Sequence, residues 1–412
     1  MIQENYKITT LDNGIRIVTE NLPHVNSFAL GFWFNTGSRN ENSQNNGISH
    51  FTEHMLFKGT KKRSSKKISD EVESLGGYLN AFTSKEHTCY YGRGLSRHLP
   101  KVLDVLSDMV QNSVFKASEI KKESGVIVDE LNDIEDSPEE LIFDKFESNL
   151  YKVNSLHYPI IGTEQNIRSL KHNDFKEYLR NFYTSNNMVI SASGEIDHEK
   201  LVKLVEKNVK LKIAERKNRI KKLKLKRADN LHIQKEIQQA HVIIGRSAAG
   251  YNSKERIKVN LISHILGEGS SSRLFHTLRE KNGITYQINT FLNSFSDIST
   301  FGVYFSTGNK TLHKASDLVY REFDKVINKG INRREFNRGK EYLKGQLLMQ
   351  LESTTNRMVR MAQSLFLFDK VKLIQQSIDE IDKISLDETI ELSKSLLNKD
   401  KFSKIIISSE KM

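Results

Sequence analysis

Two histidines and a glutamate stand close together near the start of the chain. The segment His50-Phe51-Thr52-Glu53-His54 places its two imidazoles four residues apart. On a helix, residues four apart share a face, so both rings could bind one metal ion. Glu53 adjoins them and could approach a water at that metal. This order inverts the His-Glu-x-x-His motif and predicts the zinc site of a peptidase.

A catalytic zinc ion needs a third protein ligand and keeps its fourth position open for water. Glu123 and Glu130 lie seven residues apart in a segment with helical periodicity, 116–134. Two turns of helix nearly restore the same direction, so both carboxylates face one side. One could bind the metal while the other orients a ligand from behind. Taken alone, such a pair is more typical of a solvated helix face, and the alternative stays open here.

The length and composition predict a globular protein with two domains. The chain has 412 residues, more than one hydrophobic core usually serves. Its single cysteine, Cys89, excludes an intramolecular disulfide and disfavours a cysteine-based zinc site. No apolar run follows the first residues, and no stretch approaches the length of a membrane span. We therefore expect a cytoplasmic protein without a signal peptide or a membrane span.

The net charge of +12 is concentrated in one segment. Residues 200–227 hold 13 Lys or Arg and two Glu, a net of +11, which leaves about +1 for the rest of the chain. A nucleic-acid-binding protein more typically spreads its positive charge over a folded face that also carries aromatic residues. The segment has no aromatic residue, so it indicates a solvated helix end followed by a linker. We expect no nucleic-acid partner.

The remaining elements must position the motif. Apolar spacing predicts helices around the histidines and the glutamates, and strands at 27–34, 78–95 and 187–195. A similar order of elements restarts near residue 239, and Phe115–Leu131 matches the pattern of Ile331–Leu347. We therefore predict an α+β fold, a tandem repeat of two similar domains that each have a mostly antiparallel sheet covered by helices.

The repeat also predicts the domain boundaries. They are a zinc-binding catalytic domain at 1–212, a basic linker at 213–230, and a degenerate second copy at 231–412. The second copy has Ser263 and His264 where the repeat would place the zinc motif, so only one metal site is expected in each chain.

The block from His50 to Thr60, with Glu123 and Glu130, strongly resembles the pitrilysin/insulinase metallopeptidase family. It is most similar to the branch that holds the catalytic (beta) subunit of the mitochondrial processing peptidase and its bacterial homologues. The resemblance covers nearly the whole chain and implies the LuxS/processing-peptidase-like metalloenzyme fold. It implies one Zn²⁺ per chain, bound by His50, His54 and Glu130, with Glu53 as general base. Glu123 matches the family's accessory glutamate.

Further segments resemble the family's substrate-binding parts. Gly76–Thr83 is similar to the active-site edge strand, where Asn80, Ala81 and Phe82 would bind an extended peptide as an added strand. Arg279 and Tyr286 match a pair that contacts the scissile region from the opposite half, in an active chamber. The resemblance also implies a homodimer whose sites are shared between halves. One departure is Gly267-Glu268-Gly269, where the family usually has three glycines.

Two acidic residues raise the question of selectivity. Glu140 and Asp144 are four apart, so a helix that starts near Pro138 would place both carboxylates on one face. Taken alone, they indicate a solvated acidic face. Residues at these offsets in the processing peptidase contact an arginine just before the cleavage site. The resemblance therefore implies that Glu140 and Asp144 bind substrate arginine.

The sequence thus predicts a zinc-dependent endopeptidase that hydrolyses extended, basic, Arg-containing peptides or presequences. Two other functions remain open. A non-catalytic core or partner subunit occurs in the same family, but such chains usually lose zinc ligands, and this chain keeps them all. A nucleic-acid-binding protein would have to use the basic segment alone.

Overall fold

The computed structural model describes residues 4–214 and 228–410, and the chain divides into two compact units. Unit 1 comprises Met1–Asn132, Tyr158–Lys222 and Met349–Ile374, and unit 2 comprises Asp133–His157, Leu223–Leu348 and Gln375–Met412. Each unit therefore includes one segment from the other half of the chain. The basic linker expected at 213–230 lies mostly outside the described residues.

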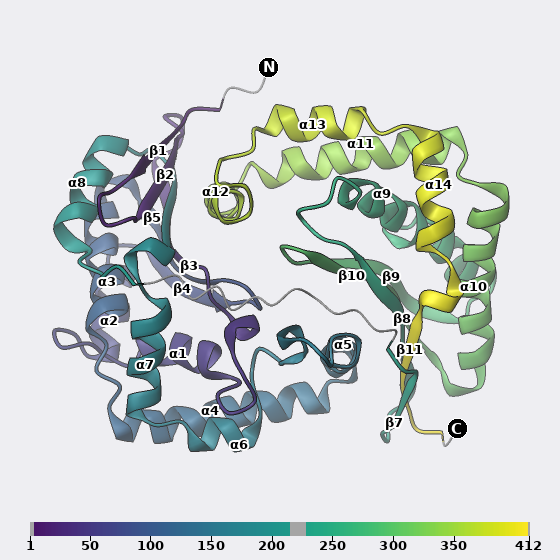
Figure 1. The fold of residues 1–412 in the computed structure, drawn as a ribbon, viewed down its shortest axis with the longest axis horizontal. Helices are drawn as coiled ribbons and strands as arrows, with labels where there is room; N and C mark the ends of the chain where they lie inside the picture. Colours follow the sequence, from purple (N-terminus) through teal and green to yellow (C-terminus); the bar gives the residue numbers. More distant parts are fainter. Residues whose placement is uncertain (1–3, 215–227, 411–412) are drawn as a thin grey trace. The chain divides into compact units, whose positions relative to one another are not determined.

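Unit 1 is built on a six-stranded sheet in the order β1-β2-β6-β3-β5-β4 (Figure 1). Its strands are β1 (Tyr6–Thr10), β2 (Arg16–Asn21), β3 (Ser27–Phe34), β4 (Tyr78–Thr83), β5 (Thr88–Leu95) and β6 (Met188–Gly194). Only β2 and β6 are parallel to each other, and every other neighbouring pair is antiparallel. β4 lies at one edge of the sheet, as the substrate-strand hypothesis requires.

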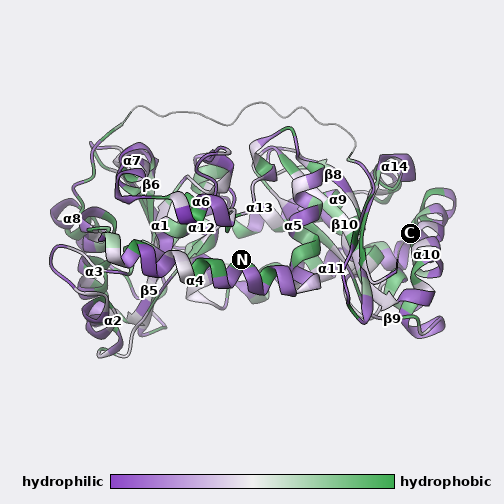
Figure 2. Ribbon diagram, turned by 90° about the horizontal axis from the view of Figure 1, so that it is seen from below, coloured by the Kyte–Doolittle hydropathy of each residue, from purple (hydrophilic) through white to green (hydrophobic). Residues whose placement is uncertain are grey.

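Most helices of unit 1 come from the N-terminal half of the chain. They are α1 (Ile48–Leu56), α2 (Ser65–Glu73), α3 (Leu99–Asn112), α4 (Ala117–Asp136), α6 (Glu164–Ser169), α7 (His172–Phe182) and α8 (His198–Asn208). Hydrophilic and hydrophobic residues alternate along α4, as expected of a helix with one buried face (Figure 2). α1 and α2 contact the edge strand β4, and α3 contacts β5.

The other face of this sheet is covered by α12 (Thr354–Phe368), which comes from the C-terminal half. Met358 and Leu365 of α12 are buried in one cluster with Ala29 and Trp33 of β3. The Trp33 indole nitrogen donates to the Met358 sulfur at 3.2 Å. Burying such side chains contributes about 1.5–3 kcal/mol each, so α12 is an integral part of the unit 1 core.

Unit 2 has a five-stranded sheet in the order β7-β11-β8-β10-β9. Its strands are β7 (Leu231–Gln234), β8 (Gln239–Ala249), β9 (Thr285–Ser294), β10 (Ile298–Gly308) and β11 (Ser403–Ser408). Its helices are α5 (Pro138–Leu150), α9 (Arg256–Gly267), α10 (Leu312–Lys329), α11 (Arg333–Gln350), α13 (Ile374–Asp382) and α14 (Leu386–Leu396), with α11 and α13 extending to the boundary with unit 1. α5 comes from the N-terminal half and buries Phe146 and Leu150 against Ile243 and Ile405.

Short helical turns complete the two units. They are η1 (Ser38–Asn40), η2 (Ser96–His98), η3 (Ser155–His157), η4 (Ser185–Asn187), η5 (Phe275–Lys281), η6 (Asn309–Thr311) and η7 (Lys399–Lys401). Within the described part of the chain, no helix is both long and apolar enough to cross a membrane.

The predicted α+β tandem repeat is confirmed. In both units, one parallel pair joins an otherwise antiparallel sheet, and the strand orders correspond once β1 is set aside. The exchange of α5 and α12 between the chain halves was not predicted. Periodicity shows that a helix has an apolar face, but it does not show which sheet that face will cover.

Candidate metal centre

The start of α1 is fixed by a buried carboxylate. Glu41 accepts hydrogen bonds at 2.8 Å from the backbone N–H groups of Gly47 and Ser49, which are free donors at the helix start. Gly47 has a φ of 100°, and a Cβ there would lie 2.8 Å from the carbonyl oxygen of Ile161. The orientation of α1, and with it that of its histidines, is therefore set by the surrounding loops.

The predicted ligands lie together. Ligand atoms of His50, His54 and Glu130 are all within 4.8 Å of one another. The Nε2 atoms of the two histidines lie 3.9 and 3.7 Å from the same Glu130 oxygen. α1 provides both rings and α4 provides the carboxylate, so two helices of unit 1 build the group. Among the described residues, no other group of three or more His, Cys, Asp or Glu side chains is spaced in this way.

The second glutamate of α4 orients one of the histidines. Glu123 is buried, and its Oε1 lies 2.9 Å from Nδ1 of His54. With Nδ1 held by this bond, Nε2 of His54 is the nitrogen that faces Glu130. The other Glu123 oxygen forms an ion pair with Lys58 at 2.7 Å. Glu123 is thus held between a histidine of α1 and a lysine from the turn that follows α1.

The two histidines differ in their electrostatic surroundings. Burial and the neighbouring His54 lower the pKa of His50 to about 4, so its ring is neutral near pH 7. Burial also opposes the charge on His54. However, the hydrogen bond that its ring donates to Glu123 and the nearby Glu130 and Glu53 carboxylates outweigh this effect and raise its pKa. A cation near Nε2 of His54 is therefore electrostatically favoured.

Glu53 lies on the same helix and contacts the edge strand. Its Oε2 accepts a hydrogen bond at 2.5 Å from the hydroxyl of Thr83, at the end of β4. Burial raises the pKa of the Glu53 carboxyl, although the Thr83 bond and the His54 charge oppose that shift. A carboxylate with a raised pKa is suited to accepting and returning a proton near neutral pH.

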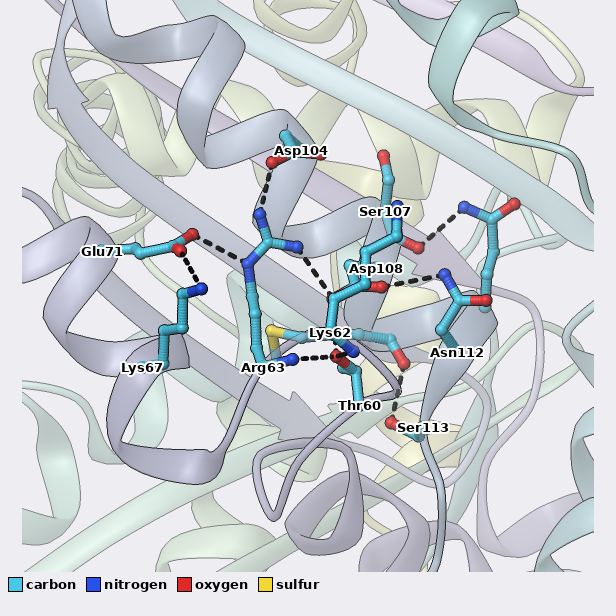
Figure 3. Close-up of polar contacts among 12 residues, drawn as sticks. Thr60, Lys62, Arg63, Lys67, Glu71, Asp104, Ser107, Asp108, Asn112 and Ser113 are labelled. Carbon is cyan, nitrogen blue, oxygen red and sulfur yellow. Dashed lines mark hydrogen bonds and ion pairs between the residues drawn. The ribbon is translucent and has the colours of Figure 1, made fainter.

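The loop between α1 and α2 is held by an ion network (Figure 3). The Arg63 guanidinium donates to Glu71 and to Asp108, each at 2.8 Å, and also pairs with Asp104. The Thr60 hydroxyl donates to the same Asp108 oxygen at 2.6 Å. The network ties the loop to α2 and α3. Lys58, which pairs with Glu123, lies two residues before Thr60 in this loop.

This donor set fits a zinc ion. Zinc in peptidases is bound by histidine nitrogens and a carboxylate oxygen, with one position left for water. Ligands at about 2.0–2.1 Å in a tetrahedron lie about 3.4 Å apart, close to the 3.7 and 3.9 Å between the histidine nitrogens and the Glu130 oxygen. The buried carboxylate behind His54 is the kind of outer partner that metal-bound histidines usually have.

The predicted substrate strand, β4, is an edge strand, and one of its backbone N–H groups is already hydrogen-bonded to a side chain. Asn80, Ala81 and Phe82 belong to β4 and pair with Tyr91, Tyr90 and Cys89 of β5. The N–H of Ala81 donates at 2.8 Å to the side-chain oxygen of Asn80. A peptide that bonds to this N–H must displace the Asn80 carboxamide.

The other predicted residues belong to unit 2. Tyr286 is on β9 and is 76% exposed, and the guanidinium of Arg279 lies 4.7 Å from its ring centre. The prediction that these two residues act as a pair therefore has a geometric counterpart within unit 2. Glu140 and Asp144 lie on α5, which begins at Pro138 as expected. The structure thus places the predicted metal ligands, Glu53, Glu123 and the β4 residues in unit 1, and the Arg279–Tyr286 and Glu140–Asp144 pairs in unit 2.

Sequence reasoning missed three residues that hold this centre. Lys58 lies four residues after His54, a spacing that could have suggested a shared side of the turn. Thr83 is the last residue of the segment that resembles the substrate strand, and nothing in its type or spacing indicated a contact with Glu53. Glu41 caps α1 from six residues before Gly47, beyond the spacing of ordinary capping motifs, so no local pattern reveals it.

The chain matches two family profiles. Residues 16–164 match the family described as Insulinase (Peptidase family M16), and residues 169–343 match the one described as Peptidase M16 inactive domain. A Bacillus subtilis protein named uncharacterized zinc protease YmxG is 36% identical over 391 residues, which are 95% of each chain. An uncharacterized zinc protease of Rickettsia felis is 35% identical over 98% of each chain.

Solved structures show the same fold at lower identity. A protease from Helicobacter pylori superposes with a TM-score of 0.91 at 21% identity, over 98% of this chain and 100% of that one. A Pseudomonas fluorescens structure described as a peptidase M16 inactive domain has a TM-score of 0.90 at 17% identity, over 99% of this chain and 98% of that one. With the curated relatives aligned over almost their entire length, the chain belongs to the insulinase (M16) family of peptidases.

Proposed function

We propose that this chain is a zinc-dependent endopeptidase with one metal site, in unit 1. The observation that supports this most strongly is the convergence of His50, His54 and Glu130 within 4.8 Å, with Glu53 on the same helix. Membership in a peptidase family and the names of its relatives, zinc proteases, support the same chemistry.

The residues of the chain would divide the work. Zinc, when bound by His50, His54 and Glu130, would polarise the scissile carbonyl and lower the pKa of the attacking water. Glu53, held at Oε2 by Thr83, would take a proton from that water on Oε1 and return it to the leaving amine. Glu123 would keep Nδ1 of His54 bonded, so that Nε2 stays aimed at the site.

The substrate would bind as an extended strand along β4. Backbone groups of Ala81 and its neighbours would form main-chain hydrogen bonds, which accept any sequence, while side-chain contacts would set selectivity. We further propose that Tyr286 and Arg279 reach the scissile region from unit 2, in the same chain or across a homodimer. The phenol of Tyr286 could then donate to the oxygen that becomes negative during the reaction.

Selectivity for arginine is a separate proposal. Glu140 and Asp144 are four apart on α5 and would pair with an Arg side chain just before the cut. A charge-assisted, bidentate contact would contribute about 1.5–3 kcal/mol, or about 10- to 150-fold in discrimination. The substrates would then be basic, extended peptides or presequences. A cytoplasmic location and the absence of a nucleic-acid partner remain predictions.

The main experiment is the Glu53→Gln substitution. We expect this variant to bind zinc like the wild type and to lose at least about 10³-fold in peptide hydrolysis, because only the proton acceptor is removed. Glu119→Gln, at a partly exposed position in the first turn of α4, is a matched control that should cleave normally. Wild-type cleavage by Glu53→Gln would refute the mechanism.

Sharing of sites across a dimer can be tested by complementation. Chains with Glu53→Gln and chains with Tyr286→Phe are mixed after each has been shown to be inactive or slow. Recovery of activity in the mixture supports shared sites. A lack of recovery in proven mixed dimers shows that each site uses residues of one chain only.

A further inference from the structure

One face of the β4–β5 hairpin carries an aromatic row formed by Phe82, Tyr91 and Tyr78. The ring centres of Phe82 and Tyr91 are 6.3 Å apart, and those of Tyr91 and Tyr78 are 6.2 Å apart. Phe82 also packs edge-on against Trp33, with ring centres 5.3 Å apart. Because α12 packs on Trp33, the row lies on the same face of the sheet as α12. The row extends from the buried core to the exposed edge.

Tyr78, at the outer end of this row, is exposed but held in position. Its side chain is 42% exposed. The guanidinium of Arg93, which lies opposite on β5, stacks 4.6 Å from its ring centre. The side-chain amide of Asn80 donates to its hydroxyl at 2.6 Å. A ring that is already fixed in this way loses little conformational entropy when a ligand packs against it.

The opposite face of β4 belongs to the metal centre. Successive side chains of a strand point to opposite faces. Thr83 points toward Glu53 of α1, so Ala81 and Leu79 share the α1 face, while Phe82, Asn80 and Tyr78 share the other. A peptide paired with β4 would therefore turn every second side chain toward the aromatic row and the remaining ones toward α1.

We propose that the aromatic row is a subsite that takes every second side chain of the bound peptide and prefers apolar or aromatic residues there. This inference rests on the proposed function, since it assumes that β4 is the strand to which the substrate adds. Side chains directly opposite each other on neighbouring strands lie 4.5–5.5 Å apart, and aromatic pairs of this kind are favourable. The positive charge of Arg93 disfavours a basic side chain at the Tyr78 end.

The outer end of the row lies at a distance from the cut. Thr83, beside Glu53, and Tyr78 are five residue steps apart, about 17 Å along an extended strand. The Tyr78 end of the subsite therefore contacts the substrate flank, whereas Phe82 lies next to the residues at the scissile bond. The substrate class is an extended peptide with alternating apolar residues whose basic residues lie on the other face.

Binding is the first test, because it does not require hydrolysis. Two labelled 14-residue peptides contain six Leu and six Ser, either alternating or in two blocks, with one Arg at each end. Anisotropy is measured with zinc-loaded Glu53→Gln protein. We expect the alternating peptide to bind about 3- to 10-fold more tightly, from two or three cross-strand pairs. Adding Tyr78→Ser and Tyr91→Ser should reduce this ratio below about 2-fold.

Two control variants separate the row from general damage. Tyr78→Phe keeps the ring and should keep the ratio, and Tyr6→Ser, on the opposite edge strand β1, should also keep it. Equal binding of both peptides to the protein with the native row would overturn the proposal. So would an undiminished affinity ratio between the two peptides in the double variant, if that variant has a native melting profile.

Cleavage gives a second, independent readout. A peptide with six central Ala residues and alternating Leu–Ser flanks offers identical residues around every central bond. The wild type should cut alternate Ala–Ala bonds, and shifting the flank pattern by one residue should shift the cuts by one. In the double variant the cuts should spread over all central bonds. Cuts that ignore the flank pattern in the wild type overturn the subsite alone, whereas binding without any cleavage overturns only the proposed peptidase function.

Discussion

Each unit has a corner in which a helix that carries a histidine faces a second helix, α1 with α4 in unit 1 and α9 with α11 in unit 2. The side chains around the histidine differ between the two corners. When His54 of α1 is aligned with His264 of α9, Asn260 takes the place of His50, and Ser263 takes the place of Glu53. His264 stacks on Tyr342 of α11, with ring centres 3.8 Å apart, whereas His54 bonds to a carboxylate of α4.

The helices that face these two histidines also carry different residues at the corresponding positions. The repeat places Gly339 and Gln346 of α11 where α4 has Glu123 and Glu130. A Cβ at Gly339 would lie 2.6 Å from Leu261 and 3.5 Å from the His264 ring, so α11 packs closely on α9 there. One histidine alone does not make a metal site. Under the proposed function, His54 is a ligand because a second histidine and two carboxylates face it, whereas His264 is a packing residue.

The largest expected difference is in zinc binding. His54→Ala should lose the metal and peptide hydrolysis, because one of three ligands is removed. His264→Ala should keep one zinc per chain and most of the activity. Metal content after dialysis and cleavage of a quenched peptide are the measurements. Loss of zinc from His264→Ala, with His54→Ala unaffected, would reverse the assignment of the two corners.

A smaller effect is expected from the lysine that supports Glu123. Lys58→Met removes the ion pair that holds this carboxylate behind His54, and unit 2 has Glu268 at the matching position. Changes to such outer partners typically cost about 10- to 100-fold in metal affinity. Zinc affinity is measured by competition with a chromophoric chelator, with Lys62→Met in the same loop as a control. Equal affinities for both variants would show that Lys58 has no positioning role.

In unit 2 the stack should affect stability rather than metal binding. Tyr342→Ala leaves one face of the buried His264 uncovered, and we expect a loss of about 1–2 kcal/mol in the free energy of unfolding. Tyr342→Phe keeps the stack and should be nearly neutral. Chemical denaturation measures both, alongside zinc content, which should not change. Unaltered stability of Tyr342→Ala would mean that the stack contributes nothing.

The smallest effect concerns the loops that follow α1 and α9. In unit 2, Arg273 pairs with Glu335 at 2.7 Å, whereas in unit 1 Arg63 pairs with Glu71. Burial opposes the charge on Glu71, but Lys101 and Arg63 lower its pKa to about 2 from an ordinary value of 4.5. The stabilisation is therefore complete above pH 4.5 and is lost as the pH falls toward 2.

Thermal melts of the wild type and Glu71→Gln should reveal this dependence. We expect the wild type to melt a few degrees higher at pH 6–7, with the difference shrinking steadily below pH 4.5. A difference that stays constant on acidification would show that the charge of Glu71 is not its source.

Much of this architecture could be predicted from local sequence. The helix expected over 116–134 spans Ala117–Asp136, and the helix expected near Pro138 begins there, because apolar periodicity and an early proline specify them. The ligand group could be predicted because four- and seven-residue spacings on helices fix which side chains share a face. Lys58, Glu41 and the exchange of α5 and α12 depend on contacts between distant segments, which no local pattern encodes.

Binding of the catalytic zinc by α1 and α4 of unit 1 is tested most directly by a crystal structure of the zinc-loaded Glu53→Gln protein. Anomalous diffraction would be measured on both sides of the zinc absorption edge. We predict one edge-dependent peak per chain, coordinated by His50, His54 and Glu130, with none beside His264. A peak elsewhere, or no peak in protein that carries zinc in solution, would contradict the account.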